Sequence, residues 1–210
     1  MAIPIFNNKY AQWALHLLAI LYLWSVFVIP NRLDWLLWWY LFYLPLEVPV
    51  FAALLLVRGR IRRPVLFVCT LLISAGLVFR VADMASFMVF GRPFNPVLDA
   101  YLLPFGFDLL RSSIGLAGAL LVALLLVLVI ALILACSFFA LKRVQRLLGR
   151  VPSNAALAGV AAVFVVWLIG YAGAWSKSSR YFFDQLSAHG NKVVSSLHEL
   201  EEFREAIKTD

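Results

Sequence analysis

Long apolar runs, separated by short polar or basic stretches, dominate the sequence. Five windows are long and apolar enough to cross about 30 Å of hydrocarbon as helices. They cover approximately residues 13–29, 35–57, 65–79, 114–141 and 155–175. Because backbone groups in lipid must be satisfied within the segment, these windows predict helices and not open strands. The expected fold class is all-α: a polytopic integral membrane protein with five transmembrane helices.

The segment between the third and fourth windows has a different character. Residues 80–113 are too polar to span a membrane and too apolar to be a free loop. Pro93, Pro96 and Pro104 disfavour one long helix. We expect a helical continuation from Arg80 to about Phe90, a turn over residues 91–96, and then one or two short helices at the membrane interface. Residues 1–176 are thus predicted to be one transmembrane domain with an outer interfacial segment.

The last stretch, residues 177–210, is predicted to be an extracytoplasmic linker followed by an amphipathic helix. Its aromatic cluster at residues 181–183 suits the headgroup zone. Ser196 and Glu199 have the spacing of a capping box, which predicts a helix start there. An apolar stripe follows at helical spacing: Leu197, Leu200, Phe203 and Ile207. Such a face fits either a helix lying on its own bundle or a joint to another domain or partner.

Composition agrees with this interpretation. The chain has 210 residues, of which 64% are hydrophobic and only 14% are charged. A soluble domain would lack the polar residues to cover its surface. Cys69 and Cys136 lie inside predicted spans, where a thiol packs as a small apolar group. Their spacing predicts neither a disulfide framework nor a metal site, and no motif points to a cofactor.

Charge predicts the orientation in the membrane. Two loops are strongly basic, RGRIRRP at residues 58–64 and KRVQRLLGR at residues 142–150. With Lys9 they hold nine of the eighteen Lys and Arg residues and none of the eleven acidic residues. Such short loops stay in the cytoplasm and rest on anionic headgroups. We therefore expect a bacterial inner-membrane protein with a cytoplasmic amino terminus and a periplasmic carboxyl terminus. The net charge of +7 does not indicate nucleic-acid binding, since these loops lie against the membrane.

Polar residues of the outer segment support two hypotheses. In the first, Arg80, Arg92, Asn95 and Arg111 bind a lipid phosphate, because guanidinium groups match phosphate oxygens with bidentate geometry. In the second, the arginines pair with Asp83 and Asp99 and attach the segment to the bundle. Arg80 and Asp83 are three residues apart on a helix and share one face.

Glu47 is the one acidic residue predicted near mid-membrane, between Pro45 and Pro49. A charge there is costly, so we expect it to be neutral, paired or in contact with water. His16 is the expected partner, whereas a helical rise of about 1.5 Å per residue places Arg80 roughly 18 Å further out. A kinked structural glutamate is favoured over a proton path, because no second copy of this span indicates a transporter repeat.

One family resemblance rests on the outer segment. An R-x-x-D pair (Arg80, Asp83) ends the third span, the stretch GRPFNPVLD follows, and Leu110, Ser113 and Gly115 form an L-x-x-S-x-G entry to the fourth. This arrangement resembles the membrane domain of bacterial sulfatase-like proteins, the lipoteichoic-acid-synthase and phosphoethanolamine-transferase group of the alkaline phosphatase superfamily.

The resemblance implies a membrane anchor for a lipid headgroup transferase, whose outer domain carries a threonine or comparable nucleophile and a metal held by Asp, Glu and His. This chain has two threonines, Thr70 and Thr209, and three scattered histidines, so no such site is expected within it. It would be the membrane half of a longer enzyme or a relative without the chemistry. The alternative function is a non-catalytic subunit of a larger respiratory, photosynthetic or export complex. In either case membrane lipids are expected partners.

Overall fold

The structure is a computed structural model that describes residues 9–32, 44–174, 178–179 and 181–209. Its elements are α1 (Lys9–Val28), β1 (Leu44–Pro45), α2 (Glu47–Leu55), α3 (Arg62–Phe90), α4 (Pro96–Leu148), α5 (Ser153–Ile169), a π-helical turn (Gly170–Ala174), β2 (Ser178–Ser179) and α6 (Tyr181–Thr209). The predicted helical class is confirmed. Within the described ranges, four helices are long and apolar enough to cross a membrane: residues 9–28, 62–90, 96–148 and 153–172.

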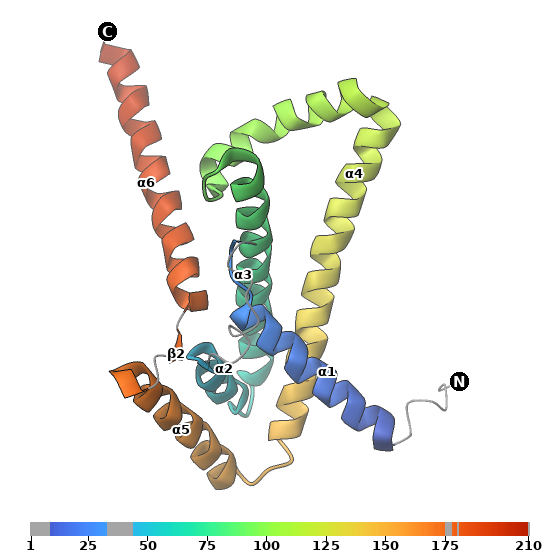
Figure 1. Ribbon diagram of the computed structural model, residues 1–210, viewed down its shortest axis with the longest axis vertical. Helices are drawn as coiled ribbons and strands as arrows, with labels where there is room; N and C mark the ends of the chain where they lie inside the picture. The colour runs from blue at the N-terminus through green and yellow to red at the C-terminus, as the bar shows by residue number, and fades with distance from the viewer. Residues whose placement is uncertain (1–8, 33–43, 175–177, 180, 210) are drawn as a thin grey trace.

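The count of five spans is not confirmed. Most of the first half of the second predicted window lies outside the described residues, and the described part is β1 followed by the short helix α2. β1 pairs in parallel with β2, with Leu44 opposite Ser178 and Pro45 opposite Ser179. This pairing brings the start of α2 beside the start of α6, which is far away in sequence (Figure 1).

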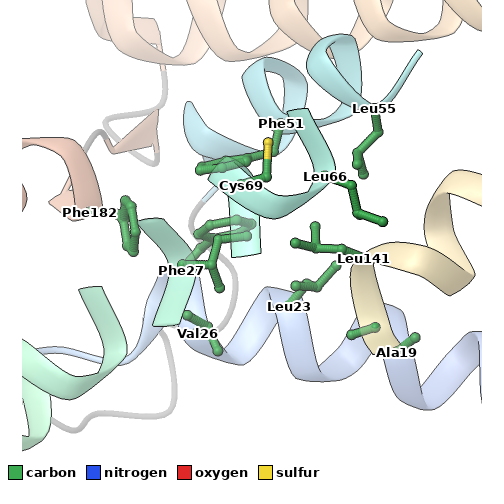
Figure 2. Packing of buried hydrophobic residues seen from close by; sticks show 12 residues of the cluster. Ala19, Leu23, Val26, Phe27, Phe51, Leu55, Leu66, Cys69, Leu141 and Phe182 are labelled. Carbon is green, nitrogen blue, oxygen red and sulfur yellow. The ribbon is translucent and has the colours of Figure 1, made fainter. Parts of the chain in front are cut away.

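The hydrophobic core lies where α1, α2, α3, α4 and the first turn of α6 meet (Figure 2). Phe27 stacks on Phe51 with ring centroids 5.4 Å apart, and the Phe182 ring meets both edge-on. Gly76 of α3 allows this approach, because a Cβ there would lie 2.2 Å from the Phe182 ring. Phe182 is 1% exposed, so its ring belongs to the core of the bundle and not to its surface.

At the other end of α3, the predicted turn is confirmed. α3 ends at Gly91, whose φ of 66° is a left-handed conformation that glycine adopts without strain. The side chain of Asn95 then caps α4, accepting hydrogen bonds from the backbone N–H groups of Val97 and Leu98. Pro96 occupies the first helical position, where its missing N–H costs nothing.

α4 consists of two arms that form an arch with α3 (Figure 1). The first arm (residues 96–114) and the second arm (residues 115–148) join at Gly115, where φ is 76° and ψ is 167°. The sequence predicted that Pro104 would break the interfacial segment, yet Pro104 lies inside the first arm. The position is exposed, so the carbonyl freed by Pro104 is not buried, whereas the conformation at Gly115 suits glycine alone.

The carboxyl-terminal helix begins earlier than predicted. α6 runs without a break from Tyr181 to Thr209, so Ser196 is inside the helix and the capping-box prediction is wrong. Ser196 is buried, and its hydroxyl oxygen accepts a hydrogen bond from Asn95 Nδ2 at 2.9 Å. The side chains of Leu200, Phe203 and Ile207 lie outside the described part of the chain, so the predicted apolar stripe is not tested there.

Candidate functional site

Arg80 is buried on the side of α3 that faces α1 and α6, with 1% of its surface exposed. Its guanidinium donates to the backbone carbonyls of Val26 and Phe27, at the end of α1. Nε donates to Gln185 Oε1 at 3.1 Å, and the Phe182 ring lies 5.3 Å from the guanidinium carbon. Arg80 therefore joins three helices, and its guanidinium is directed into the protein and not toward lipid.

Asp83 is the next buried charge along the same face of α3. Its carboxylate accepts hydrogen bonds from Asn31 Nδ2 at 3.3 Å, from the backbone N–H of Phe94 at 2.9 Å and from His189 Nε2 at 3.2 Å. The His189 ring also stacks on Phe79, with centroids 4.8 Å apart. Asp83 thus connects the segment after α1, the 91–95 turn and α6. These partners differ from Arg80, the partner that helical spacing predicted.

Glu47 is fully buried at the first residue of α2. Its Oε1 accepts a hydrogen bond from the backbone N–H of Phe183 at 3.0 Å. That N–H belongs to the first turn of α6, where helical N–H groups have no partner within the helix. Glu47 therefore caps α6 across the bundle, with its Oε1 as the acceptor for an N–H of the first turn. Together with Arg80, Asp83, Gln185 and His189 it forms what we call the polar cluster.

The pairing predicted for Glu47 is wrong. His16 is buried near the other end of α1, where it meets Trp13 edge-on and the positive charges of Arg143 and Arg146 act on it. The charge of Arg80, predicted to be too distant, acts on Glu47 instead. The prediction failed because it assumed a continuous helix before Glu47, whereas residues 44–45 are extended.

Arg92 and Asn95 gather around Asp99 at the start of α4. The Arg92 guanidinium forms an ion pair with the Asp99 carboxylate, which also accepts the backbone N–H of Asn95 at 2.8 Å. The Arg92 side chain is 40% exposed, so one side of it stays accessible. This is the ion pair named by the second hypothesis for the outer segment.

The four residues predicted to bind lipid phosphate do not converge on one site. Arg80 is buried against α1 and α6, whereas Arg92 and Asn95 lie at the start of α4. Arg111 is exposed near the end of the first arm, roughly 24 Å along the helix from Asn95.

A large cavity lies beneath the arch, between α3 and both arms of α4. Its volume is about 630 Å³, within the usual range for ligand pockets of about 300–1,000 Å³. We call it the arch cavity. Its lining is almost entirely apolar and comprises Ala82, Ala85, Ser86, Val89, Phe90, Phe94, Asp99, Leu102, Leu103, Gly106, Phe107, Leu110, Ala119, Val122, Ala123 and Leu126. Many of these side chains are exposed, so the cavity opens on the side of the bundle.

Ser86 is the one polar residue among those that α3 contributes to the lining of the arch cavity. It is 5% exposed, and its hydroxyl has no hydrogen-bond partner within the described part of the chain. Thr70 and Ser113 show the usual alternative, since each donates at 2.8 Å to the carbonyl four residues earlier. A buried hydroxyl without a partner is uncommon and is satisfied when a ligand supplies one.

The sequence contains a signal for this cavity that was not used. Ala82, Ala85 and Ser86 form a small-residue stripe on α3, and Ala119 and Ala123 form another on α4. Small residues usually permit close helix contact. Here the first arm of α4 separates the two stripes, and the bend at Gly115 turns the second arm back alongside α3, so their small size leaves space (Figure 1).

The described residues form a candidate binding cavity but show no cluster suited to hold a catalytic metal ion. No three of their His, Cys, Asp and Glu side chains are placed to hold a metal ion. The space between Arg80, Gln185 and His189 has no room for a water-sized molecule, so the arch cavity is the better candidate site. Comparisons of the chain with protein-family models, curated proteins and solved structures give no match, and the family resemblance stays a prediction from the sequence.

Proposed function

We propose that the protein is a membrane domain that binds one hydrocarbon chain of a membrane lipid in the arch cavity. The observation that carries this proposal is the cavity itself, an apolar space of about 630 Å³ between two helices that are long and apolar enough to span the membrane. The hydrocarbon layer surrounds such helices, so lipid chains are the apolar molecules present there at the highest concentration. The side opening lets a chain enter without crossing water.

Polar groups near the end of α3 favour one direction for the lipid. Ser86 and Asp99 line the part of the cavity close to the 91–95 turn, whereas Ala123 and Leu126 line the part deeper along the second arm. The lipid's oxygen-bearing end lies by Ser86, whose hydroxyl donates to an ester or headgroup oxygen. Arg92, paired with Asp99 and partly exposed, lies beside that end and attracts a phosphate.

The finer proposal concerns the role of the bound lipid. In the predicted orientation the arch faces the outer leaflet, because the basic loops at the opposite end stay inside the cell. A lipid held there is presented to an extracytoplasmic headgroup transferase, in keeping with the sequence resemblance to the membrane domain of sulfatase-like proteins. The catalytic groups would belong to another domain or chain, and this domain would supply lipid binding.

The test compares two exposed alanines of the second arm. Ala123 lines the cavity, whereas Ala131 lies two turns further along and does not. The full chain is purified in mild detergent, and co-purified phospholipid is measured per protein by native mass spectrometry. Ala123→Phe fills the cavity and should remove most of the bound lipid, while Ala131→Phe should retain it. Equal lipid content in the two variants would contradict the proposal.

A further inference from the structure

A second, smaller cavity lies at the end of α3 opposite the arch. It has a volume of about 180 Å³ and lies between the end of α2, the start of α3 and the end of α4. Its polar lining is formed by Arg58, Gly59, Arg62, Gln145 and Gly149. We call it the basic pocket. Since a water molecule takes about 30 Å³ of liquid, the space suits a group of several heavy atoms.

The positive charge of the basic pocket comes from two arginines. Arg58 and Arg62 both line it, and no carboxylate belongs to its described lining. α3 begins at Arg62, and this helix start has neither a side-chain cap nor an acidic residue in its first turn. The Arg62 N–H already donates to the Gly59 carbonyl and Pro64 has no N–H, so this helix start contributes its partial positive charge and not a row of free donors. All of these groups favour an anion.

Gln145 provides an independent observation that points to a ligand. It lies in the last turns of α4, is 5% exposed and lines the same pocket. Its Nε2 has no hydrogen-bond partner among the described residues. The amide nitrogen is a donor, and buried donors are rarely left without an acceptor in a folded protein.

We propose that the basic pocket binds a phosphate group. Arg58 and Arg62 pair with the phosphate oxygens, and Gln145 Nε2 donates to one of them. Guanidinium groups match tetrahedral oxyanions geometrically, and helix amino termini are common phosphate sites. The group is either free phosphate or the headgroup of an anionic phospholipid at this end of the bundle. This site is independent of the lipid chain proposed for the arch cavity.

A defined site differs from diffuse attraction by the whole basic loop. Arg60 and Arg63 belong to the same loop and carry the same charge, yet neither lines the pocket. If only the loop's total charge attracts phosphate, removing Arg63 and removing Arg62 have equal effects. If the pocket binds the phosphate, removing Arg62 weakens binding and removing Arg63 does not. The neighbouring arginines are therefore matched variants.

The experiment uses the full chain in detergent. One arm titrates inorganic phosphate and the other titrates mixed micelles containing phosphatidic acid, with binding measured by calorimetry. Arg62→Gln and Gln145→Leu should each weaken binding about tenfold or more, as expected for hydrogen bonds to a charged group. Arg63→Gln should bind within about twofold of the unchanged protein, since Arg63 does not line the pocket. Thermal unfolding of each variant checks that it is folded.

The two arms identify the source of the phosphate group. Binding of inorganic phosphate that depends on Arg62 indicates free phosphate, whereas binding only of phosphatidic acid indicates a lipid headgroup. The proposal is overturned if neither probe binds, or if Arg63→Gln weakens binding as much as Arg62→Gln. Loss of binding in Arg62→Gln with no effect of Gln145→Leu would also overturn it.

Discussion

Two faces of the same turns of α3 differ in how closely other parts of the protein pack against them. On one face, Arg80 and Asp83 are buried against α1 and α6, and each makes several hydrogen bonds. The space around Arg80 has no room for a water-sized molecule. On the other face, Ala82, Ala85 and Ser86 line a cavity of about 630 Å³. The face with Arg80 is closely packed, whereas the small-residue face leaves an open space.

The difference teaches where to look for a binding site in this protein. A charged side chain in a membrane helix is a functional candidate by default, because its burial is costly. Here the charges of Arg80 and Asp83 are satisfied by backbone and side-chain groups, so they connect helices. The binding candidate is the apolar face, because its small side chains leave space between α3 and the two arms of α4.

Substitution of Arg80 should have the largest effect on stability. Arg80→Met removes the donors to the Val26 and Phe27 carbonyls and to Gln185, so we expect a loss of about 3–5 kcal/mol in the free energy of unfolding. Thermal unfolding in detergent, followed by tryptophan fluorescence, measures it. Arg111→Met is the matched control at an exposed position and should change stability by less than about 0.5 kcal/mol. Normal stability with reduced lipid binding would show that Arg80 is a lipid ligand after all.

Gly76 tests the close contact between α3 and α6. In Gly76→Ala the new Cβ lies 2.2 Å from the Phe182 ring, so the ring or the helix must shift. Overpacking of this kind costs about 1–3 kcal/mol. Gly159→Ala is the control within α5, where nothing lies within 4 Å of the added methyl, and it should be neutral or slightly stabilising. Adding Phe182→Leu to Gly76→Ala should recover part of the loss, and no recovery would exclude this contact as the cause.

Asn95 tests the connection between the arch and α6. Asn95→Ala removes the cap of α4 and the hydrogen bond to Ser196, so we expect a loss of about 1 kcal/mol. Asn154→Ala changes an exposed asparagine in the first turn of α5 and serves as control. Hydrogen exchange of the first arm should increase in Asn95→Ala alone. Unchanged exchange there would mean that the cap does not hold the arm.

Ser86→Ala should have the smallest effect on stability, and Ser137→Ala is the variant with which it contrasts. Ser137 is also buried, but its hydroxyl lies 2.9 Å from the Tyr22 hydroxyl, so Ser137→Ala should cost about 1 kcal/mol. Ser86→Ala removes a hydroxyl that has no partner among the described residues, so stability in lipid-free detergent should stay equal or rise slightly. Lipid retention should fall in Ser86→Ala and not in Ser137→Ala. A destabilised Ser86→Ala protein would show that the hydroxyl already has a structural partner.

Local features of the chain were predictable because their causes are local. Apolar runs predicted the helices, since hydrocarbon accepts only segments with satisfied backbones. Gly91 and Pro96 predicted the turn after α3, because glycine and proline restrict or permit backbone angles regardless of context. The capping box at Ser196 failed as a local signal, because packing against α3 and α4 keeps α6 helical on both sides of it.

The sequence by itself determined that the chain is helical, that it contains helices long and apolar enough to span a membrane, and that basic residues gather in two short segments. Only the tertiary structure decided that Glu47 caps α6, that Arg80 is occupied by carbonyls of α1, and that space remains under the arch. The first two outcomes depend on contacts between residues 53 to 136 positions apart, which no local pattern encodes. The bend at Gly115 is the decisive element, because a straight α4 would carry Ala119 and Ala123 away from α3 and leave the cavity without its second wall (Figure 1).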